Sequence, residues 1–154
     1  MQMDRMSADA YRELLRIQAE NEQRKKPKRV IGHPEADLQK ACVEWFRKQY
    51  PKHWRMLFAV PNGGSRNKAE AVSLLGQGVV PGVSDLILLE ARGGYGALCI
   101  ELKTTRKDSK QSDRQEVWQR DAESFGNKYV VVRTLEEFQE VVNDYMKGHL
   151  AFIF

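Results

Sequence analysis

The chain has few of the residues that build disulfide-linked or zinc-stabilised domains. Its 154 residues include two cysteines and three histidines, and the histidines are scattered, with no Cys or His at a zinc-site spacing. Cys42 and Cys99 lie in two separate apolar segments, so we expect each to be a small buried hydrophobic residue. The composition therefore argues against a disulfide framework and against a structural zinc centre.

Long hydrophobic runs are also missing. No segment approaches the roughly 20 apolar residues that cross a bilayer, and the first residues, MQMDRMSADAYRELL, mix acidic and basic side chains, unlike a secretory signal. Hydrophobic residues make up 42% and charged residues 30% of the chain, which is typical of one globular domain of this length. We therefore expect a cytoplasmic protein with no membrane partner.

The charges that are present are unevenly distributed. The net charge is +4. Basic residues gather in RKKPKR at 24–29 and in KTTRKDSK at 103–110, whereas acidic residues gather in EEFQEVVND at 136–144. This separation is typical of a protein that binds a polyanion on one side. The alternative is that both basic runs are ordinary solvated loops.

The order of the expected elements predicts a mixed α/β domain. We expect helices over residues 7–24, 34–50, 69–78, 112–126 and 134–146, a hairpin over residues 81–103, and strands over residues 55–60, 128–134 and 150–154. Ser112 and Thr134 have the positions of helix N-caps. We expect residues 1–30 to form an N-terminal helix and basic linker, and residues 31–154 to form the main domain.

The hairpin carries three ionisable side chains in its otherwise apolar strands. Its turn, ARGGYG, is centred near Gly93, and Asp85 and Glu101 are equally distant from that centre, so they should lie opposite one another. Side chains alternate along a strand, which places Glu101 and Lys103 on the same side. The hairpin therefore predicts that two carboxylates and one ammonium group meet at its open end.

Two facing carboxylates repel each other and destabilise a sheet. A raised pKa on one of them is one remedy. A divalent cation between them is another, and an oxygen-rich site favours Mg²⁺ or Mn²⁺ over zinc. Lys103 would then offset charge and reach a phosphate oxygen. Alternatively, Asp85 caps the strand, and Glu101 and Lys103 form a surface pair.

Asp85 together with the Glu101-Leu102-Lys103 segment resembles the PD-(D/E)XK nuclease motif. More narrowly, the chain is similar to the VRR-NUC domain family, and the matching segments occur in the family's order. They are EADLQ (35–39), PNGGSR (61–66), GVVPGVSDLIL (78–88), IELK (100–103), SDRQEVW (112–118) and YVVVRT (129–134). Ser84 departs from the proline that the family usually has before the aspartate.

The resemblance implies a role for each residue of the motif. Asp85 and Glu101 would ligate the metal ion together with the backbone carbonyl of Leu102, and Lys103 would be the catalytic lysine. Glu35 would complete the metal shell, directly or through water; otherwise it stabilises the N-terminus of its helix. Gln115 would lie beside the catalytic residues; otherwise it forms a capping box with Ser112.

Several polar residues are candidates for DNA binding. In the PNGGSR loop, glycines let backbone N–H groups approach a phosphate, and Asn62 and Arg66 add donors. The alternative is a simple turn. The basic loop after the hairpin adds Arg106, Lys107 and Lys110. Of the tryptophans that can stack on bases, Trp45 and Trp118 fall on apolar helix stripes and are expected in the core, which leaves Trp54.

These features together predict a restriction-endonuclease-like α/β fold and Mg²⁺- or Mn²⁺-dependent hydrolysis of DNA, with no small-molecule cofactor. Stand-alone proteins of this type, bacterial or phage-encoded, resemble Holliday-junction resolvases, and a nearly two-fold symmetric junction suits a homodimer. The alternatives are a flap, nicking or restriction-type endonuclease, an RNA-processing nuclease, and a non-catalytic DNA-binding module.

Overall fold

The computed structural model describes residues 34–61, 67–106 and 109–148. In chain order the elements are α2 (Pro34–Gln49), the 3-10 turn η1 (Trp54–Met56), β1 (Leu57–Ala59), α3 (Lys68–Gly76), β2 (Leu86–Leu88), β3 (Leu98–Leu102), α4 (Asp113–Ser124), β4 (Lys128–Val132) and α5 (Leu135–Lys147). The expected helix at 7–24, the basic linker and the expected strand at 150–154 lie outside the described residues, so the predicted domain division stays a prediction.

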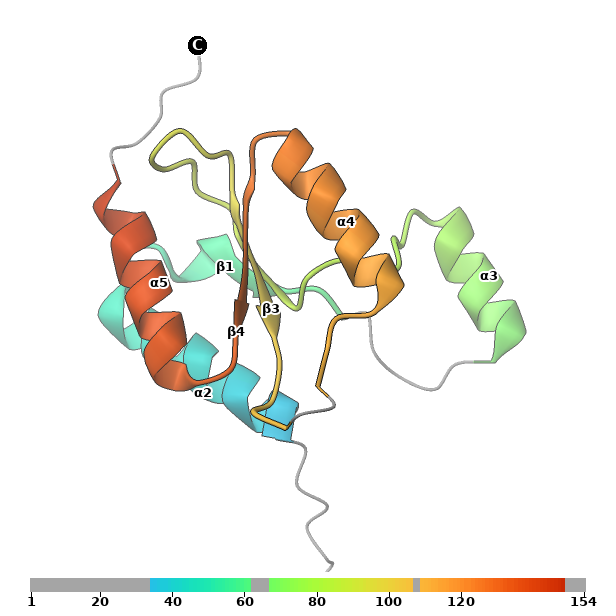
Figure 1. The fold of residues 1–154 in the computed structure, drawn as a ribbon, viewed down its shortest axis with the longest axis horizontal. Coiled ribbons are helices and arrows are strands. Elements are labelled where there is room, and N and C mark those ends of the chain that lie inside the picture. Colours follow the sequence, from blue (N-terminus) through green and yellow to red (C-terminus); the bar gives the residue numbers. More distant parts are fainter. Residues whose placement is uncertain (1–33, 62–66, 107–108, 149–154) are drawn as a thin grey trace, which may run out of the picture. The chain divides into compact units, whose positions relative to one another are not determined.

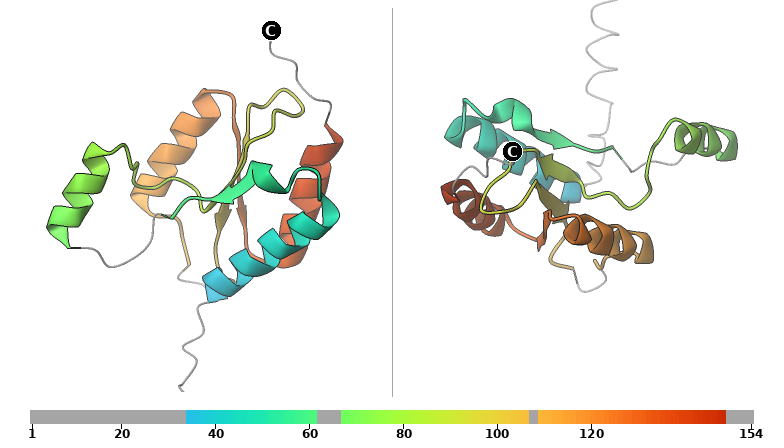
Figure 2. Two further views of the ribbon diagram at one scale, coloured as in Figure 1. Left: turned by 180° about the vertical axis from the view of Figure 1, so that it is seen from behind. Right: turned by 90° about the horizontal axis from the view of Figure 1, so that it is seen from above.

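The strands form one mixed sheet in the order β1-β2-β3-β4. β1, β2 and β3 are antiparallel neighbours, whereas β4 runs parallel to β3. Helices α2 and α5 pack on one face of this sheet, and α4 packs on the other (Figures 1 and 2). This arrangement confirms the predicted α/β class. No helix in the described ranges is long and apolar enough to span a membrane.

Alternation along the strands separates the face that packs against α2 and α5 from the face that packs against α4. Leu86, Leu98 and Ile100 are fully buried and join Phe46 of α2 and Phe138 of α5 in the hydrophobic core. The residues between them in sequence point toward α4, as the period of two in a strand requires. Glu101 lies between two core residues of β3, so its carboxylate emerges on the α4 side.

The hairpin has the predicted register. Leu86 pairs with Ile100 and Ile87 pairs with Cys99, and both pairs are centred on position 93. Gly93 and Gly94 have φ angles of 58° and 86°, as the type I′ turns that suit a tight hairpin require. Continued by one residue, the same register sets Asp85 opposite Glu101.

Local signals at the helix ends are also confirmed, with two corrections. Ser112 and Gln115 form a capping box, and Thr134 accepts a hydrogen bond from the backbone N–H of Glu137. The strand expected at 55–60 is shorter, because Trp54–Met56 forms a 3-10 turn closed by the hydrogen bond from Met56 N to His53 O. The strand expected to reach Thr134 ends at Val132, because the backbone N–H of Arg133 donates to the Glu137 carboxylate.

Candidate active site

The end of β3 brings Glu101, Lys103 and Gln115 into direct contact. Glu101 Oε1 lies 2.9 Å from Lys103 Nζ and accepts a hydrogen bond from Gln115 Nε2. Lys103 Nζ also donates to Gln115 Oε1 over 3.3 Å. Glu101 and Lys103 are buried, with 1% and 9% of their surfaces exposed, so this is not the surface pair that was the alternative interpretation.

The second carboxyl oxygen of Glu101 is the unusual atom of this cluster. Oε2 is buried, and within the described part of the chain it has no hydrogen-bond partner. A buried carboxylate oxygen without a partner is costly, since it has lost its hydration without gaining another interaction. Glu101 is therefore a position where a proton or a cation would stabilise the fold.

Asp85 is tied to the same strand end by the backbone. Its Oδ2 accepts a hydrogen bond from Leu102 N over 2.8 Å. The preceding Ser84 is fully buried, and its hydroxyl donates to the carbonyl of Leu86 over 3.2 Å. Ser84 therefore fixes the entry to β2 through a hydrogen bond, where the family's usual proline would restrict the backbone itself.

Burial and neighbouring acids raise the pKa values of the two carboxyl groups at this strand end. Burial, then the Asp85 carboxylate, raises the pKa of Glu101 to about 7, although Lys103 opposes the shift. Burial also raises the pKa of Asp85, against the effect of the Leu102 N–H and Lys103. The Glu35 carboxylate adds to both upward pKa shifts, so it also contributes negative potential at Asp85 and Glu101.

Glu35 reaches this region from the first turn of α2. Its Oε1 accepts a hydrogen bond from Ser109 Oγ over 3.3 Å, and Ser109 Oγ accepts one from Thr104 N over 3.0 Å. Arg133 Nη1 donates to the carbonyls of Thr104 and Ser109 over 2.5 and 3.1 Å. Ser109 and Arg133 therefore position the chain that follows β3, and no local sequence pattern pointed to them.

Gln115 combines both functions considered for it. Its Oε1 accepts from Ser112 N over 2.8 Å, as a capping box requires, while its Nε2 donates to Glu101. The N-terminus of α4 is itself held close to the PGVSD segment. A Cβ added at Gly82 would lie 2.4 Å from the carbonyl oxygen of Arg114, so only glycine allows this approach.

A further layer of polar residues lies behind the carboxylates. Tyr129 is buried on the α4 side of β4, and its hydroxyl accepts from Gln111 Nε2 over 3.1 Å. The same Nε2 donates to Gln119 Oε1 over 3.1 Å. Burial, together with the Glu101 carboxylate, raises the pKa of Tyr129, so the phenol stays neutral beside the acids.

The donor set fits a hard divalent cation only in part. Among the described residues no group of three or more His, Cys, Asp or Glu side chains is placed to hold a metal ion. The carboxylate of Glu101 has a buried oxygen without a hydrogen-bond partner in the described part of the chain, and burial raises the pKa of both Glu101 and Asp85, with the Asp85 carboxylate adding to the shift of Glu101. Carboxylate and carbonyl oxygens are the ligands that Mg²⁺ and Mn²⁺ prefer, so the chemistry of this cluster suits either ion.

The predicted DNA contacts divide into two groups. Arg106 and Lys110 are exposed on the segments that follow β3. Asn62, Arg66 and Lys107 lie outside the described residues. Trp45 packs against Tyr50 and Phe138 beside the core, as expected. Trp118 packs against Tyr129 on the α4 side but is only half-buried and lies outside the core cluster, so the expectation of core packing was wrong for this residue.

Among solved structures, the chain is similar to a protein described as a "VRR_NUC domain protein". The two chains superpose with a TM-score of 0.65 and 25% sequence identity, over 77% of this chain and 93% of the other. No protein-family model matches the chain. No curated protein matches it either. The structural match supports the predicted resemblance to the VRR-NUC family, confirms the predicted fold, and indicates a nuclease-type domain.

Proposed function

We propose that this protein is a metal-dependent endonuclease that hydrolyses DNA phosphodiester bonds at the Asp85–Glu101–Lys103 cluster. The observation that carries the proposal is the buried Glu101 carboxylate, which has one oxygen bound to Lys103 and Gln115 and the other without a hydrogen-bond partner among the described residues. A purely DNA-binding module gains nothing from opposed, buried carboxylates. A nuclease with this family's fold uses such a pair to hold a cation.

Each side chain has a defined task in hydrolysis. Asp85, Glu101 and the Leu102 carbonyl would hold Mg²⁺ or Mn²⁺, which supplies Lewis acidity and lowers the pKa of a bound water when it is present. In the reaction one P–O bond forms to a water oxygen, another P–O bond breaks, and negative charge builds up on the phosphate. The Lys103 ammonium, fixed by Glu101, stabilises that charge and orients the water.

Gln115 and Glu35 support these groups. Gln115 acts as a positioning residue, because it contacts both Glu101 and Lys103 and is fixed by the α4 capping box. Glu35 contributes negative potential from α2 and completes the cation's shell directly or through water. Arg106 and Lys110, with Asn62, Arg66 and Lys107, bind the DNA backbone on either side of the scissile bond.

The substrate we favour is branched DNA, with a Holliday junction cut by a homodimer. Two active sites related by two-fold symmetry match the symmetry of a junction. A surface for the second copy is available on α3, whose sequence KAEAVSLLG is largely apolar although none of its residues is buried. Leu75 lines a cleft of about 490 Å³ with Val117 and Trp118 of α4, which adds apolar area to this surface.

Cleavage of labelled four-way junction, flap, linear duplex and RNA substrates tests the proposal. We expect paired symmetric nicks in the junction with Mg²⁺ or Mn²⁺, and none with a chelator. Asp85→Asn and Lys103→Ala should each lower the cleavage rate by at least about a hundredfold, the usual loss when a charge-stabilising group is removed. Glu140→Gln, which changes an exposed carboxylate of α5, is the matched control and should cleave normally.

The possible results separate the alternatives. Metal-dependent cleavage of flaps or linear duplex, without cleavage of the junction, would support the proposed active site but refute the proposal that the protein is a Holliday-junction resolvase. Preferential cleavage of RNA would show that the protein is an RNA-processing nuclease and not a DNA nuclease. Binding of DNA by folded protein without cleavage under any metal condition would leave the non-catalytic module as the correct interpretation.

A further inference from the structure

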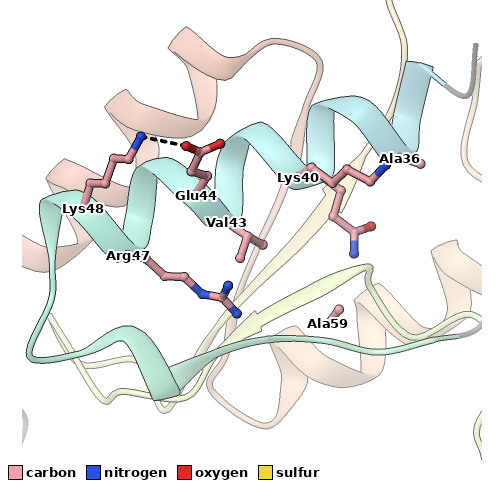
Figure 3. Close-up of a pocket in the computed structure, with 8 residues that line it drawn as sticks. Ala36, Lys40, Val43, Glu44, Arg47, Lys48 and Ala59 are labelled. Atoms are coloured by element: carbon pink, nitrogen blue, oxygen red, sulfur yellow. Dashed lines mark hydrogen bonds and ion pairs between the residues drawn. The ribbon is translucent and has the colours of Figure 1, made fainter.

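A groove runs along α2 beside the edge strand β1. It has a volume of about 680 Å³, and one continuous face of α2 forms its wall, with β1 opposite (Figure 3). The residues that line it are Ala36, Gln39, Lys40, Val43, Glu44, Arg47, Lys48 and Ala59. From residue 36 to 48 this face is about 18 Å long, which is comparable to roughly five stacked nucleotides.

One end of the groove lies beside the carboxylate cluster. Ala36 directly follows Glu35 on α2. On the opposite wall, Ala59 pairs with Leu86, and the next residue, Val60, donates its N–H to the carbonyl of Asp85 over 2.9 Å. The groove therefore begins at the helix turn that carries Glu35 and at the strand edge that is hydrogen-bonded to the backbone of Asp85.

The other end carries two arginines on an exposed tryptophan. The guanidinium carbons of Arg47 and Arg55 lie 5.6 and 5.1 Å from the centre of the Trp54 ring. Trp54 is 43% exposed, unlike Trp45 and Trp118. Within the described ranges neither arginine has a carboxylate partner, whereas Lys48 is paired with Glu44 and Lys40 with Asp37.

Figure 3 shows how these charges are arranged. Arg47 and Val43 point from α2 toward β1, whereas the Lys48–Glu44 pair points away from β1. Of the cations that line the groove, Lys40 and Lys48 are paired with acids, and only Arg47 has no carboxylate partner among the described residues. Unpaired arginines beside an accessible aromatic ring have the chemistry of a site for nucleic-acid strands, where phosphates bind guanidinium groups and bases stack on rings.

The segment that presents Trp54 is anchored at both ends. His53 Nδ1 lies 2.9 Å from Glu90 Oε2, and Leu89 N donates to Met56 O over 2.9 Å. Glu90 is also paired with Arg92. An exposed aromatic side chain on a fixed backbone loses little conformational entropy when it binds a ligand.

We infer that the groove between α2 and β1 binds a single strand of DNA that extends from the cleavage site, with Arg47, Arg55 and Trp54 as its distal contact. The guanidinium groups bind phosphates, and a base that stacks on Trp54 displaces one of them from the ring. This inference rests on the proposed nuclease function, because it assigns the path of that enzyme's substrate.

Binding without cleavage tests the groove directly. The probes are a short duplex with a single-stranded thymidine tail and the same duplex with blunt ends, in buffer with a chelator. Arg47→Ala/Arg55→Ala and Trp54→Ala should each weaken binding of the tailed duplex about tenfold or more, with a much smaller effect on the blunt one. The double variant should also reduce the salt dependence of log K by about one per lost phosphate contact.

Arg120→Ala and Phe125→Ala, which change an exposed arginine and an exposed aromatic residue near α4, are the matched controls. In addition, oligothymidylate should quench the tryptophan fluorescence of the wild-type protein, and Trp54→Phe should remove that quenching. Since all five changed residues are exposed, equal thermal midpoints will show that the variants remain folded.

Equal tail binding by wild-type and groove variants, or equal losses in the two controls, would overturn the groove assignment. A wild-type protein that does not discriminate the tailed from the blunt duplex would overturn it as well. A protein that binds the tail through these residues yet cleaves no DNA would instead overturn the proposed nuclease function and leave the groove assignment intact.

Discussion

At the scale of single residues, the carboxylate of Glu101 is unfavourable for folding but required for the proposed chemistry. Its neighbours in β3 are core residues, yet its carboxylate is 1% exposed and one of its oxygens has no partner in the described chain. An apolar side chain here would stabilise the sheet and lose the site. The ionised Glu101 side chain therefore destabilises the metal-free protein. Because its pKa is raised in the fold, this loss of free energy of unfolding can be measured as a function of pH.

The stability of metal-free protein should fall as the pH rises from about 4.5 to 7. Glu101 has an ordinary pKa of 4.5, raised to about 7 in the fold. Between these values the folded state keeps a proton that the unfolded state releases, so the free energy of unfolding decreases, by up to about 3 kcal/mol over the window. Thermal midpoints measured against pH in the presence of a chelator give this slope.

Glu101→Gln should flatten that slope, because the variant cannot ionise at this position. Glu140→Gln should keep it, since Glu140 is exposed and outside the cluster. Saturating Mg²⁺ should raise the wild-type midpoint most at pH 7 and above, where a cation replaces the proton. A Glu101→Gln protein with the wild-type pH profile would show that Glu101 is not the titrating group.

The two roles of Gln115 should separate in two variants. Ser112→Ala removes the hydroxyl that accepts from the Gln115 backbone N–H but leaves the contact between Gln115 and Glu101, whereas Gln115→Ala removes the side-chain half of the capping box and the contact with Glu101. Each should lower stability by about 1 kcal/mol. Only Gln115→Ala should also lower the rate of DNA cleavage, by roughly ten- to a hundredfold, with little effect on KM. Equal cleavage rates in both variants would show that Gln115 acts only as a capping residue of α4.

At the scale of elements, the hairpin was predictable from the sequence, whereas the 3-10 turn before β1 was not. The Gly93–Gly94 turn and the apolar strands on each side determine one register, so the pairing at 86–100 follows from sequence alone. The 3-10 turn at Trp54–Met56 depends on contacts with Leu89 and Glu90, more than 30 residues away. No local pattern encodes such contacts, and the same holds for Arg133 and Ser109.

The close approach of the PGVSD segment to α4 predicts a difference between two glycines. Gly82→Ala should lower stability by about 2–4 kcal/mol, because the new Cβ would meet Arg114 O at 2.4 Å in addition to the strain of a positive φ. Gly78→Ala has a similar φ of 94° but nothing within 4 Å, so it should cost only about 1 kcal/mol. Urea denaturation of both variants measures the difference.

Cleavage by the same two variants adds a functional control. Gly82→Ala should displace the N-terminus of α4 and with it Gln115, so its residual folded protein should cleave more slowly than Gly78→Ala. Equal losses of stability in the two variants would mean that the segment between α3 and β2 adjusts to the added methyl group. The packing argument for Gly82 would then be wrong.

At the scale of the whole molecule, the apolar surface of α3 is the main feature that one copy leaves unexplained. Ten large hydrophobic side chains are at least 40% exposed in the described chain, and two of them, Val72 and Leu75, belong to this nine-residue helix. An apolar helix surface of this kind is a candidate interface when it forms one contiguous patch, and the cleft lined by Leu75, Val117 and Trp118 adjoins it. A homodimer through α3 would bury it and provide the two active sites that a junction requires.

Leu75→Glu should therefore convert a dimer into a monomer. Leu75 and Leu89 are exposed to similar extents, 53% and 56%, but Leu89 belongs to the hairpin and not to α3, so Leu89→Glu is the matched control. We expect sedimentation equilibrium to show a dimer for the wild type and the control, and a monomer for Leu75→Glu. The monomer should keep its carboxylate cluster, and thus nick DNA singly while losing paired cuts across a junction. A monomeric wild-type protein that still makes paired cuts would refute the symmetry argument, because one copy would then have served both strands in turn.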